Sequence, residues 1–243
     1  MSIIVNAASG NPALDTDTSP ADDIIASPAL LDWFEGEADY VTQAAGKVTA
    51  LISRGGSAGK SFSQASTGKQ ALLTSSALNG CSELTFSGAQ VYTISANYTL
   101  SDAFTWIIVY KPRSNLDVLF GNQTSTSQRS NFESIAGANA LFAHGNGTVQ
   151  LPHTAGSYNL AIMGHDGATL WLSINGGAYT TAATDNNVST STLVLGGINI
   201  TPANPFVGGF SDLWIIAGKP TDNADLIDLI KTFVRNEYGL TIA

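Results

Sequence analysis

The sequence is poor in cysteine and in charge. Of its 243 residues, only Cys81 is a cysteine, and 12% are Asp, Glu, Lys or Arg, about half the usual charged share. A single cysteine cannot form an intramolecular disulfide, which excludes the disulfide-dense secreted domains. Ten Lys and Arg stand against 19 Asp and Glu, for a net charge of −9. Because this charge repels phosphate, nucleic acid is not an expected partner.

Long apolar runs are also missing. No stretch approaches the roughly 20 residues that a membrane-spanning helix needs, so no membrane span is predicted. The opening MSIIVNAASGNP has no basic segment followed by an apolar one, and we expect no secretory signal. The protein is therefore expected to stay in the cell that makes it, or to leave by another route such as the lysis that releases virus particles.

Short strands separated by turn residues fill most of the chain from about residue 30. The 24 glycines fall largely between runs that are rich in β-branched and aromatic residues. The predicted strands are 47–53, 82–86, 90–94, 104–111, 116–121, 141–143, 156–164, 168–174, 178–183, 191–196 and 210–217. Many short strands with frequent turns are typical of an antiparallel sandwich or barrel.

Residues 158–183 predict a three-stranded meander. Asn175-Gly176 tolerates the two positive φ angles of a type I′ hairpin turn, and Asp166-Gly167 is predicted to do the same one strand earlier. Trp171 alternates onto the face opposite Leu170. Either both faces of this sheet are covered, or Trp171 lies on a binding face.

The two ends of the chain differ in pattern. Residues 1–29 predict an extended arm or irregular lead-in, or a loop folded back on the domain, and residues 30–243 predict one domain. A helix is predicted over 222–238, with Asp222 as N-cap and Gly239 in the left-handed position after its end. Its apolar stripe, which includes Phe233, is expected to cover the sandwich edge or to contact a partner.

The order of several short motifs resembles a known superfamily. These motifs are Asp32-Trp33-Phe34, GKVTAL at 46–51, RGG at 54–56, FSQA at 62–65, Asn79-Gly80, LTFSG at 84–88, FTWIIV at 104–109, LVLGG at 193–197, FVGGFSDLWI at 206–215 and EYGL at 237–240. Together they resemble the concanavalin A-like lectin/glucanase superfamily, in its laminin-G-like jelly-roll branch, as found in bacteriophage virion proteins. The resemblance implies an all-β, two-sheet antiparallel jelly-roll sandwich with a C-terminal α-helix.

Catalytic residues are not evident. Glucanases of that superfamily carry the pattern Glu-x-Asp-x-x-Glu on one strand, because retaining hydrolysis uses two closely spaced carboxyl groups. Glu35 and Glu37 lie two apart, but we place them in a glycine-containing loop, and no Asp completes the pattern. The protein is therefore expected not to be an enzyme. A glycan hydrolase with this atypical carboxylate pair is kept as an alternative.

One run of the sequence partly matches a phosphate-binding loop, and a few side chains are candidates for holding a metal ion. The run from Arg54 to Ser61 ends like a phosphate-binding loop but lacks the first glycine and a following helix, so nucleotide binding is not expected. No histidine or cysteine spacing suits a transition metal. No cofactor is expected apart from calcium, whose candidate ligands are Asp166, Asp185 and Asn186. The alternative is that these three side chains cap turns.

Exposed aromatic side chains are the candidates for binding a glycan, because sugar faces stack on aromatic rings. They are Trp171, Tyr179, Tyr92 and Tyr98. The alternative is that each serves packing or an oligomer contact. Trp106 and Trp214 lie in apolar runs and are assigned to the core.

The resemblance, the low charge and the missing catalytic set lead to one hypothesis. The protein is a non-enzymatic structural protein of a bacteriophage virion, a capsid decoration or a tail or fibre component, with host-surface glycans as a possible ligand. Ile3, Ile4, Val5 and Phe233 are the candidate assembly residues. The partners are other virion proteins and further copies of the chain, by analogy as a trimer. The alternative is a bacterial carbohydrate-binding module.

Overall fold

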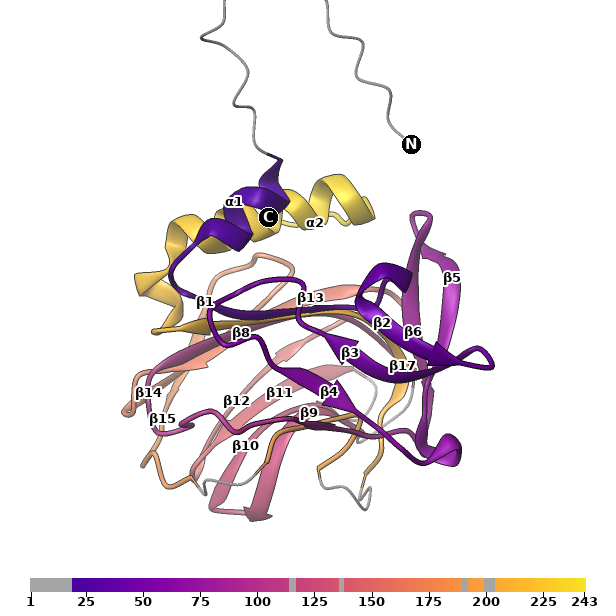
Figure 1. Cartoon of the computed structure of the whole chain (residues 1–243). Helices are drawn as coiled ribbons and strands as arrows, with labels where there is room; N and C mark the ends of the chain where they lie inside the picture. Colours follow the sequence, from indigo (N-terminus) through magenta and orange to yellow (C-terminus); the bar gives the residue numbers. More distant parts are fainter. Residues whose placement is uncertain (1–18, 114–116, 136–137, 189–191, 199–203) are drawn as a thin grey trace, which may run out of the picture.

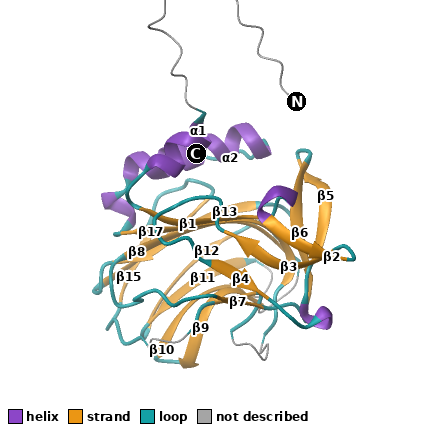
Figure 2. Ribbon diagram, viewed as in Figure 1, coloured by secondary structure: helices purple, strands orange, loops and turns teal. Residues whose placement is uncertain are grey.

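The computed structural model describes residues 19–113, 117–135, 138–188, 192–198 and 204–243. In these residues it contains 17 strands (Figure 2). The helices are α1 (Pro20–Ala26), η1 (Ala38–Tyr40), η2 (Thr67–Lys69), η3 (Pro220–Asp222) and α2 (Ala224–Tyr238). The strands are β1 (Leu30–Glu35), β2 (Val41–Ala44), β3 (Lys47–Ile52), β4 (Ser61–Ser63), β5 (Leu72–Leu78), β6 (Cys81–Ser87), β7 (Tyr92–Ile94), β8 (Phe104–Pro112), β9 (Asp117–Ser125), β10 (Gln128–Ile135), β11 (Asn139–His144), β12 (Gly147–Pro152), β13 (Asn159–His165), β14 (Thr169–Ile174), β15 (Thr180–Ala183), β16 (Val194–Leu195) and β17 (Val207–Ala217).

The strands form two antiparallel layers. The helix-side sheet has the order β15-β14-β13-β8-β17, and β1 and β6 pair with different halves of the other edge of β17. β5 lies outside β6. The distal sheet has the order β12-β11-β10-β9-β16-β7-β4-β3-β2. The expected all-β jelly-roll sandwich with a C-terminal helix is therefore confirmed.

Aromatic rings fill the space between the two sheets. Trp106 contacts Phe120 with ring centroids 4.6 Å apart, and Phe62 contacts Phe34 at 4.8 Å, both edge-on. All four side chains are at most 1% exposed. Edge-on pairs of this kind add to the free energy gained by burying the rings.

Helices α1 and α2 cover the outer face of the helix-side sheet and make a third layer (Figure 1). Strand β8 shows the consequence. Trp106 and Ile108 point between the sheets, whereas Ile107 and Val109 belong to the cluster under the helices. The strand is therefore apolar at successive positions, as expected for a strand buried on both faces. Trp106 and Trp214 are both core residues as predicted, in different layers.

The C-terminal helix begins later than predicted. Ala224 is its first residue, and Asp222 lies in the preceding 3-10 helix and does not cap α2. The end is as predicted, because Gly239 has φ 64° and its N–H donates to the carbonyl of Arg235. Within the described residues, no helix is both long and apolar enough to cross a membrane.

The two predicted hairpin turns differ. Asn175 and Gly176 have φ of 52° and 74°, which confirms the type I′ turn. Asp166 does not have positive φ. Its Oδ1 instead accepts the backbone N–H groups of Ala168 and Thr169, so this turn is held by a side chain and the type I′ prediction is wrong.

Strands β5, β10 and β12 were not predicted, and β10 was missed because its sequence is largely polar. In β10, Ser130, Asn131 and Ser134 are buried all the same. Asn131 donates to Gln123 of the neighbouring strand, and Ser130 is bonded to His144. Hydrogen bonds across the distal sheet offset the cost of burying these polar groups, and apolar periodicity does not reveal such strands.

Part of the N-terminal lead-in is a helix, not an arm. Ser19 accepts the N–H of Asp22 while the Asp22 carboxylate accepts the N–H of Ser19, a capping box. Ala21 and Ile24 are buried in the cluster that contains α2. The predicted assembly residues Ile3, Ile4 and Val5 lie outside the described residues, and the division into 1–29 and 30–243 stays a prediction.

Phe233 does not serve an intermolecular contact on the surface, so its assignment as an assembly residue is wrong. It is 6% exposed and lies between α2 and the helix-side sheet. Its ring centroid is 4.9 Å from that of Trp33 and 6.1 Å from that of Trp214. The apolar side chains of α2 therefore pack against the helix-side sheet of the same chain.

We expect Phe233→Ala to lower the free energy of unfolding by about 3–5 kcal/mol, the range for deleting a buried phenylalanine ring. Asn236→Ala, on the exposed side of the same helix, should change it by less than about 0.5 kcal/mol. Urea unfolding followed by tryptophan fluorescence measures both. Equal stabilities of the two variants would contradict the packing described here.

Candidate functional site

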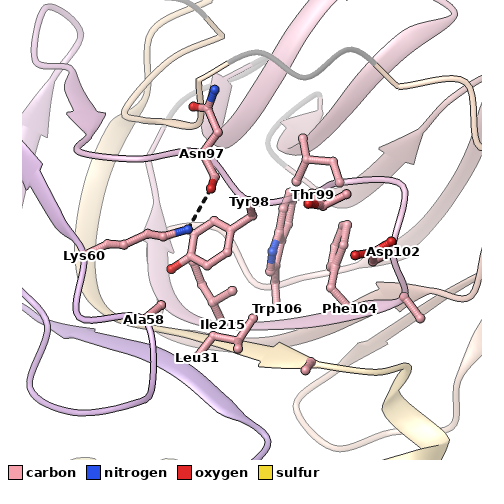
Figure 3. A pocket seen from close by; sticks show the side chains of 13 residues that line it. Leu31, Ala58, Lys60, Asn97, Tyr98, Thr99, Asp102, Phe104, Trp106 and Ile215 are labelled. Atoms are coloured by element: carbon pink, nitrogen blue, oxygen red, sulfur yellow. Dashed lines mark hydrogen bonds between the residues drawn. The ribbon is translucent and has the colours of Figure 1, made fainter.

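A pocket of about 390 Å³ lies at one end of the sandwich, and we call it the end pocket. It is formed where β1, the start of β8 and the end of β17 meet two loops (Figure 3). Its lining consists of Leu31, Ala58, Lys60, Asn97, Tyr98, Thr99, Leu100, Asp102, Ala103, Phe104, Trp106, Ile215 and Ala217.

The floor of the end pocket is aromatic and aliphatic. Phe104 and Trp106 alternate on β8, so both side chains point between the sheets, and their rings stack with centroids 4.3 Å apart. Ile215 and Ala217 alternate in the same way at the end of β17. Figure 3 shows the indole nitrogen of Trp106 on the side of the ring that faces Tyr98. The strand ends therefore give the pocket a rigid apolar base with one N–H donor.

Tyr98 forms one wall, and a buried carboxylate fixes it. Its hydroxyl donates to Oδ2 of Asp32, while the backbone N–H of Lys60 donates to Oδ1 at 2.9 Å. Asp32 is fully buried. Burial, and then the Asp32 carboxylate, raise the pKa of Tyr98 well above its usual value, so this phenol stays protonated. Asp32 thus joins the loop of Lys60 to the loop of Tyr98.

Lys60 brings a positive charge to the rim. Its ammonium donates to the carbonyl of Asn97 at 2.8 Å and lies 3.2 Å from the centroid of the Tyr98 ring. Partial burial lowers the pKa of Lys60, and Asp32 opposes that shift. An ammonium offers three N–H donors, so Lys60 can serve a ligand while keeping its bond to Asn97.

The rest of the rim is polar and exposed. Asn97, Thr99 and Asp102 lie on the loop before β8 and are accessible to solvent. Figure 3 shows Asp102 on the far side of the pocket from Lys60. The end pocket is therefore amphipathic, with an apolar floor and with a cation and a carboxylate on opposite sides of its mouth.

Two stacked histidines are connected by hydrogen bonds to the loop before β8. The ring centroids of His144 and His165 are 3.6 Å apart, and His165 Nε2 donates to the carbonyl of Leu100. Burial, and then the charge of His144, lower the pKa of His165 to about 3. Asn186 accepts from His144 and donates to the carbonyl of Ser101. The loop of Asp102 is therefore hydrogen-bonded to His165 at the end of β13 directly, and to His144 at the end of β11 through Asn186.

The four predicted glycan-binding aromatics do not lie together. Tyr98 lines the end pocket, but Tyr92 is fully buried and its hydroxyl bonds the backbone of Val48 and Ala71, so a role for Tyr92 in stacking on a sugar is wrong. Tyr179 is 37% exposed and lines a separate cavity beside α2. Trp171 is half-buried on β14, with the Lys219 ammonium 6.0 Å from its ring centroid.

The predicted calcium ligands already serve as turn acceptors. Oδ1 of Asp185 accepts the backbone N–H groups of Asn146 and Asn187, as Asp166 does in its own turn, and Asn186 is engaged with His144. Among the residues that the structure describes, no group of three or more His, Cys, Asp or Glu could hold a metal ion. Calcium binding stays a prediction.

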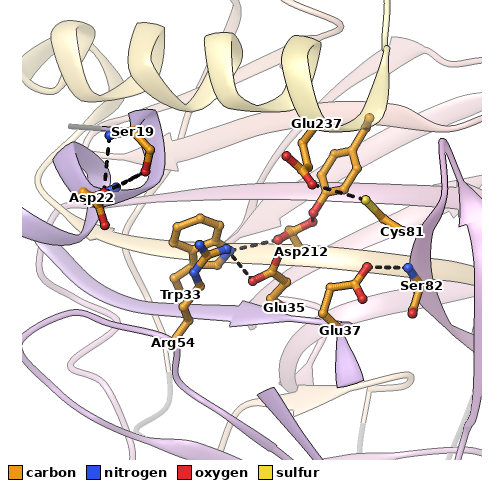
Figure 4. A network of polar contacts seen from close by, with 11 residues as sticks. Ser19, Asp22, Trp33, Glu35, Glu37, Arg54, Cys81, Ser82, Asp212 and Glu237 are labelled. Carbon is orange, nitrogen blue, oxygen red and sulfur yellow. Dashed lines mark hydrogen bonds and ion pairs between the residues drawn. The ribbon is translucent and has the colours of Figure 1, made fainter. Parts of the chain in front are cut away.

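A second polar cluster lies on the outer face of the helix-side sheet, beneath α2 (Figure 4). Glu35 is the last residue of strand β1, where a loop was expected, and it pairs with Asp212 of β17. Arg54 lies 2.7 Å from Glu35. Asp212 accepts from Trp33 Nε1 at 2.8 Å and from the hydroxyl of Tyr238 at 2.5 Å.

Burial dominates the electrostatics of this cluster. It raises the pKa of Glu35 to about 7, although the ion pair with Arg54 opposes the shift. Burial and then the neighbouring Glu35 also raise the pKa of Asp212. Glu37, by contrast, accepts the backbone N–H of Ser82 and does not line the cavity that Glu35 faces. The predicted pair Glu35 and Glu37 therefore does not share a cleft.

Comparison with known proteins identifies the fold and no family. No family model and no curated protein matches the sequence. An arabinofuranosidase complexed with arabinofuranosyl-α-1,2-xylobiose is similar with a TM-score of 0.61 and 13% identity, over 90% of this chain and 61% of that one. A mutant GH54 α-L-arabinofuranosidase is similar with a TM-score of 0.56 and 15% identity, over 84% of this chain and 59% of that one. A sialidase of Trypanosoma rangeli is similar with a TM-score of 0.57 and 9% identity, over 85% of this chain and 33% of that one.

These similarities agree with the all-β jelly-roll sandwich that the structure shows. The chain spans about three fifths of the length of either arabinofuranosidase. At such low identity the comparison supports the fold alone.

The sequence pattern singles out Tyr98 but does not reveal most of the end pocket. Lys60 belongs to the run that partly matches a phosphate-binding loop, yet this run leads directly into strand β4 at Ser61 and not into a helix. Asp32 appeared only as part of a motif. These residues belong to segments far apart in the chain, and no spacing rule joins them.

Glu35 should make the stability of the protein depend on pH. The pKa of Glu35 in the folded protein, about 7, lies above the ordinary glutamate value of 4.5. The stabilisation from protonated Glu35 is thus fully present below about pH 4.5 and is lost as the pH rises through 7. We expect the unfolding free energy of the wild type, minus that of Glu35→Gln, to decrease as the pH rises across this window, because only the wild type loses a proton at this position. Urea titrations at a series of pH values measure it, and two parallel curves would contradict it.

Proposed function

We propose that this chain is a non-enzymatic glycan-binding module, and that the end pocket holds a terminal sugar. The observation that carries this proposal is the amphipathic lining, with Tyr98 and Trp106 beside polar rim groups. Its volume of about 390 Å³ falls within the usual range for small-molecule sites.

A sugar matches both parts of this lining. Its C–H faces pack on aromatic rings, and its hydroxyl groups act as both donors and acceptors. Asp102 accepts hydrogen bonds from hydroxyls, and Lys60 donates to them. Hydrogen bonds to charged groups are the stronger ones, so two charges at the mouth can orient a neutral ligand.

Binding is favoured over hydrolysis for a specific reason. Glycosidases use two carboxyl groups that flank the scissile bond. Asp102 is the one carboxylate in the described lining of the end pocket, and the nearby Asp32 is engaged with Tyr98 and Lys60. Two of the compared proteins are named as arabinofuranosidases, which supports testing saccharides first.

The bacteriophage virion role stays a prediction, together with the virion location and the trimer. It is compatible with glycan binding, because a module that binds host-surface sugars can also be part of a particle. Mass spectrometry of purified particles would test it directly. Absence of the chain from intact particles would leave the bacterial carbohydrate-binding module as the better context.

Asp102→Ala should weaken glycan binding by roughly 10- to 100-fold, the loss expected for a hydrogen bond to a charged group. The carboxylate of Asp102 is exposed, so the fold should persist. Chemical-shift titration of the ¹⁵N-labelled chain with a panel of monosaccharides and disaccharides measures the affinity.

The matched control is Asp39→Ala, an exposed aspartate in η1 with the same loss of charge away from the pocket. It should leave the affinity unchanged. Equal affinities of the two variants, or shifts centred on Tyr179, would show that the sugar binds elsewhere.

A further inference from the structure

We infer that the sugar bound in the end pocket carries an acetamido group. This inference rests on the proposed glycan-binding function and adds the ligand class. It starts from an imbalance in the lining: the polar groups lie at the mouth, and the deeper surface is apolar.

The deep part of the lining offers almost nothing to a hydroxyl group. Leu100, Phe104 and Ile215 are at most 5% exposed, and Ala103 and Ala217 add methyl groups nearer the mouth. An unmodified hexose carries a hydroxyl on nearly every ring carbon. A hydroxyl turned into this surface without a partner costs about 1–3 kcal/mol, so a plain sugar is confined to the mouth.

An acetamido group complements the deep part of the lining, because it combines an apolar methyl with a carbonyl that accepts a hydrogen bond. Its methyl can rest against the alanine and isoleucine side chains at the end of β17, where burial of apolar area is favourable. Its carbonyl can accept from the one donor on the floor, the indole N–H of Trp106, whose nitrogen faces the Tyr98 side of the pocket. Its N–H remains for an acceptor on the rim.

The rim offers such an acceptor on the loop before β8. Asp102 carries an exposed carboxylate, which can accept the N–H of the acetamido group. Lys60 adds the capacity for an acidic substituent elsewhere on the same sugar. The panel therefore includes an acidic acetamido sugar beside the neutral ones.

The test compares sugars that differ only at this group. N-acetylglucosamine is paired with glucose and N-acetylgalactosamine with galactose, as methyl glycosides, with N-acetylneuraminic acid as the acidic case. We expect each acetamido sugar to bind the full chain at least 10-fold more tightly than its plain partner in chemical-shift titrations. Equal binding within each pair would overturn this inference and leave the proposed function standing. Absence of binding by every sugar, extended to the disaccharide panel, would overturn both.

A variant pair locates the effect. Ala217→Leu places a larger side chain in the end pocket at an exposed strand end, so it should bring the affinity ratio within each pair close to one. Ala183→Leu makes the same change at the exposed end of β15, outside the pocket lining, and should keep the ratio. Thermal unfolding confirms that both variants fold. A ratio that survives Ala217→Leu would contradict the placement of the acetamido group.

Discussion

The central strands of the helix-side sheet are buried on both faces, and the rest of the structure follows from the need to cover them. The distal sheet covers one side of β8 and β17, and helices α1 and α2 cover the other. Trp33, Trp214 and Phe233 meet where the helices lie on the sheet. A chain that builds three such layers has few positions for charged side chains, which accounts for the low charged fraction.

The carboxylates that are buried have defined partners, and they join segments distant in sequence. Asp212 connects β17 with β1 and with the end of α2 through Trp33 and Tyr238. Asp32 connects β1 with the loops of Lys60 and Tyr98. A buried charge without partners would be costly, so these groups specify one arrangement of the loops around the sandwich. The loops that Asp32 joins form the wall of the end pocket.

The end pocket lies at the start of β8 and the end of β17. The inward-facing residues there continue the apolar alternation of the core and still pack against the distal sheet, and the loops of Lys60 and Tyr98 border them on the side of the pocket. The apolar floor is therefore a consequence of the sandwich, and the loops supply the polar mouth. This division favours a binding role for the site, because the same scaffold can present different rim groups without repacking its core.

The sequence alone determined the features that depend on neighbours in the chain. The apolar run of β8, the Asn175-Gly176 turn and the glycine after α2 follow from local backbone preferences and periodicity, and so does the sandwich as a class. Strand β10 and the position of Glu35 were missed, because hydrogen bonds and burial across sheets override polar composition. Tyr92 and Tyr98 show the limit most clearly. They are the same residue type in the same stretch, yet one hydroxyl bonds the backbone inside the core and the other bonds Asp32 at a pocket wall. Only the tertiary structure decided between them, because the partner that fixes each ring comes from a distant strand.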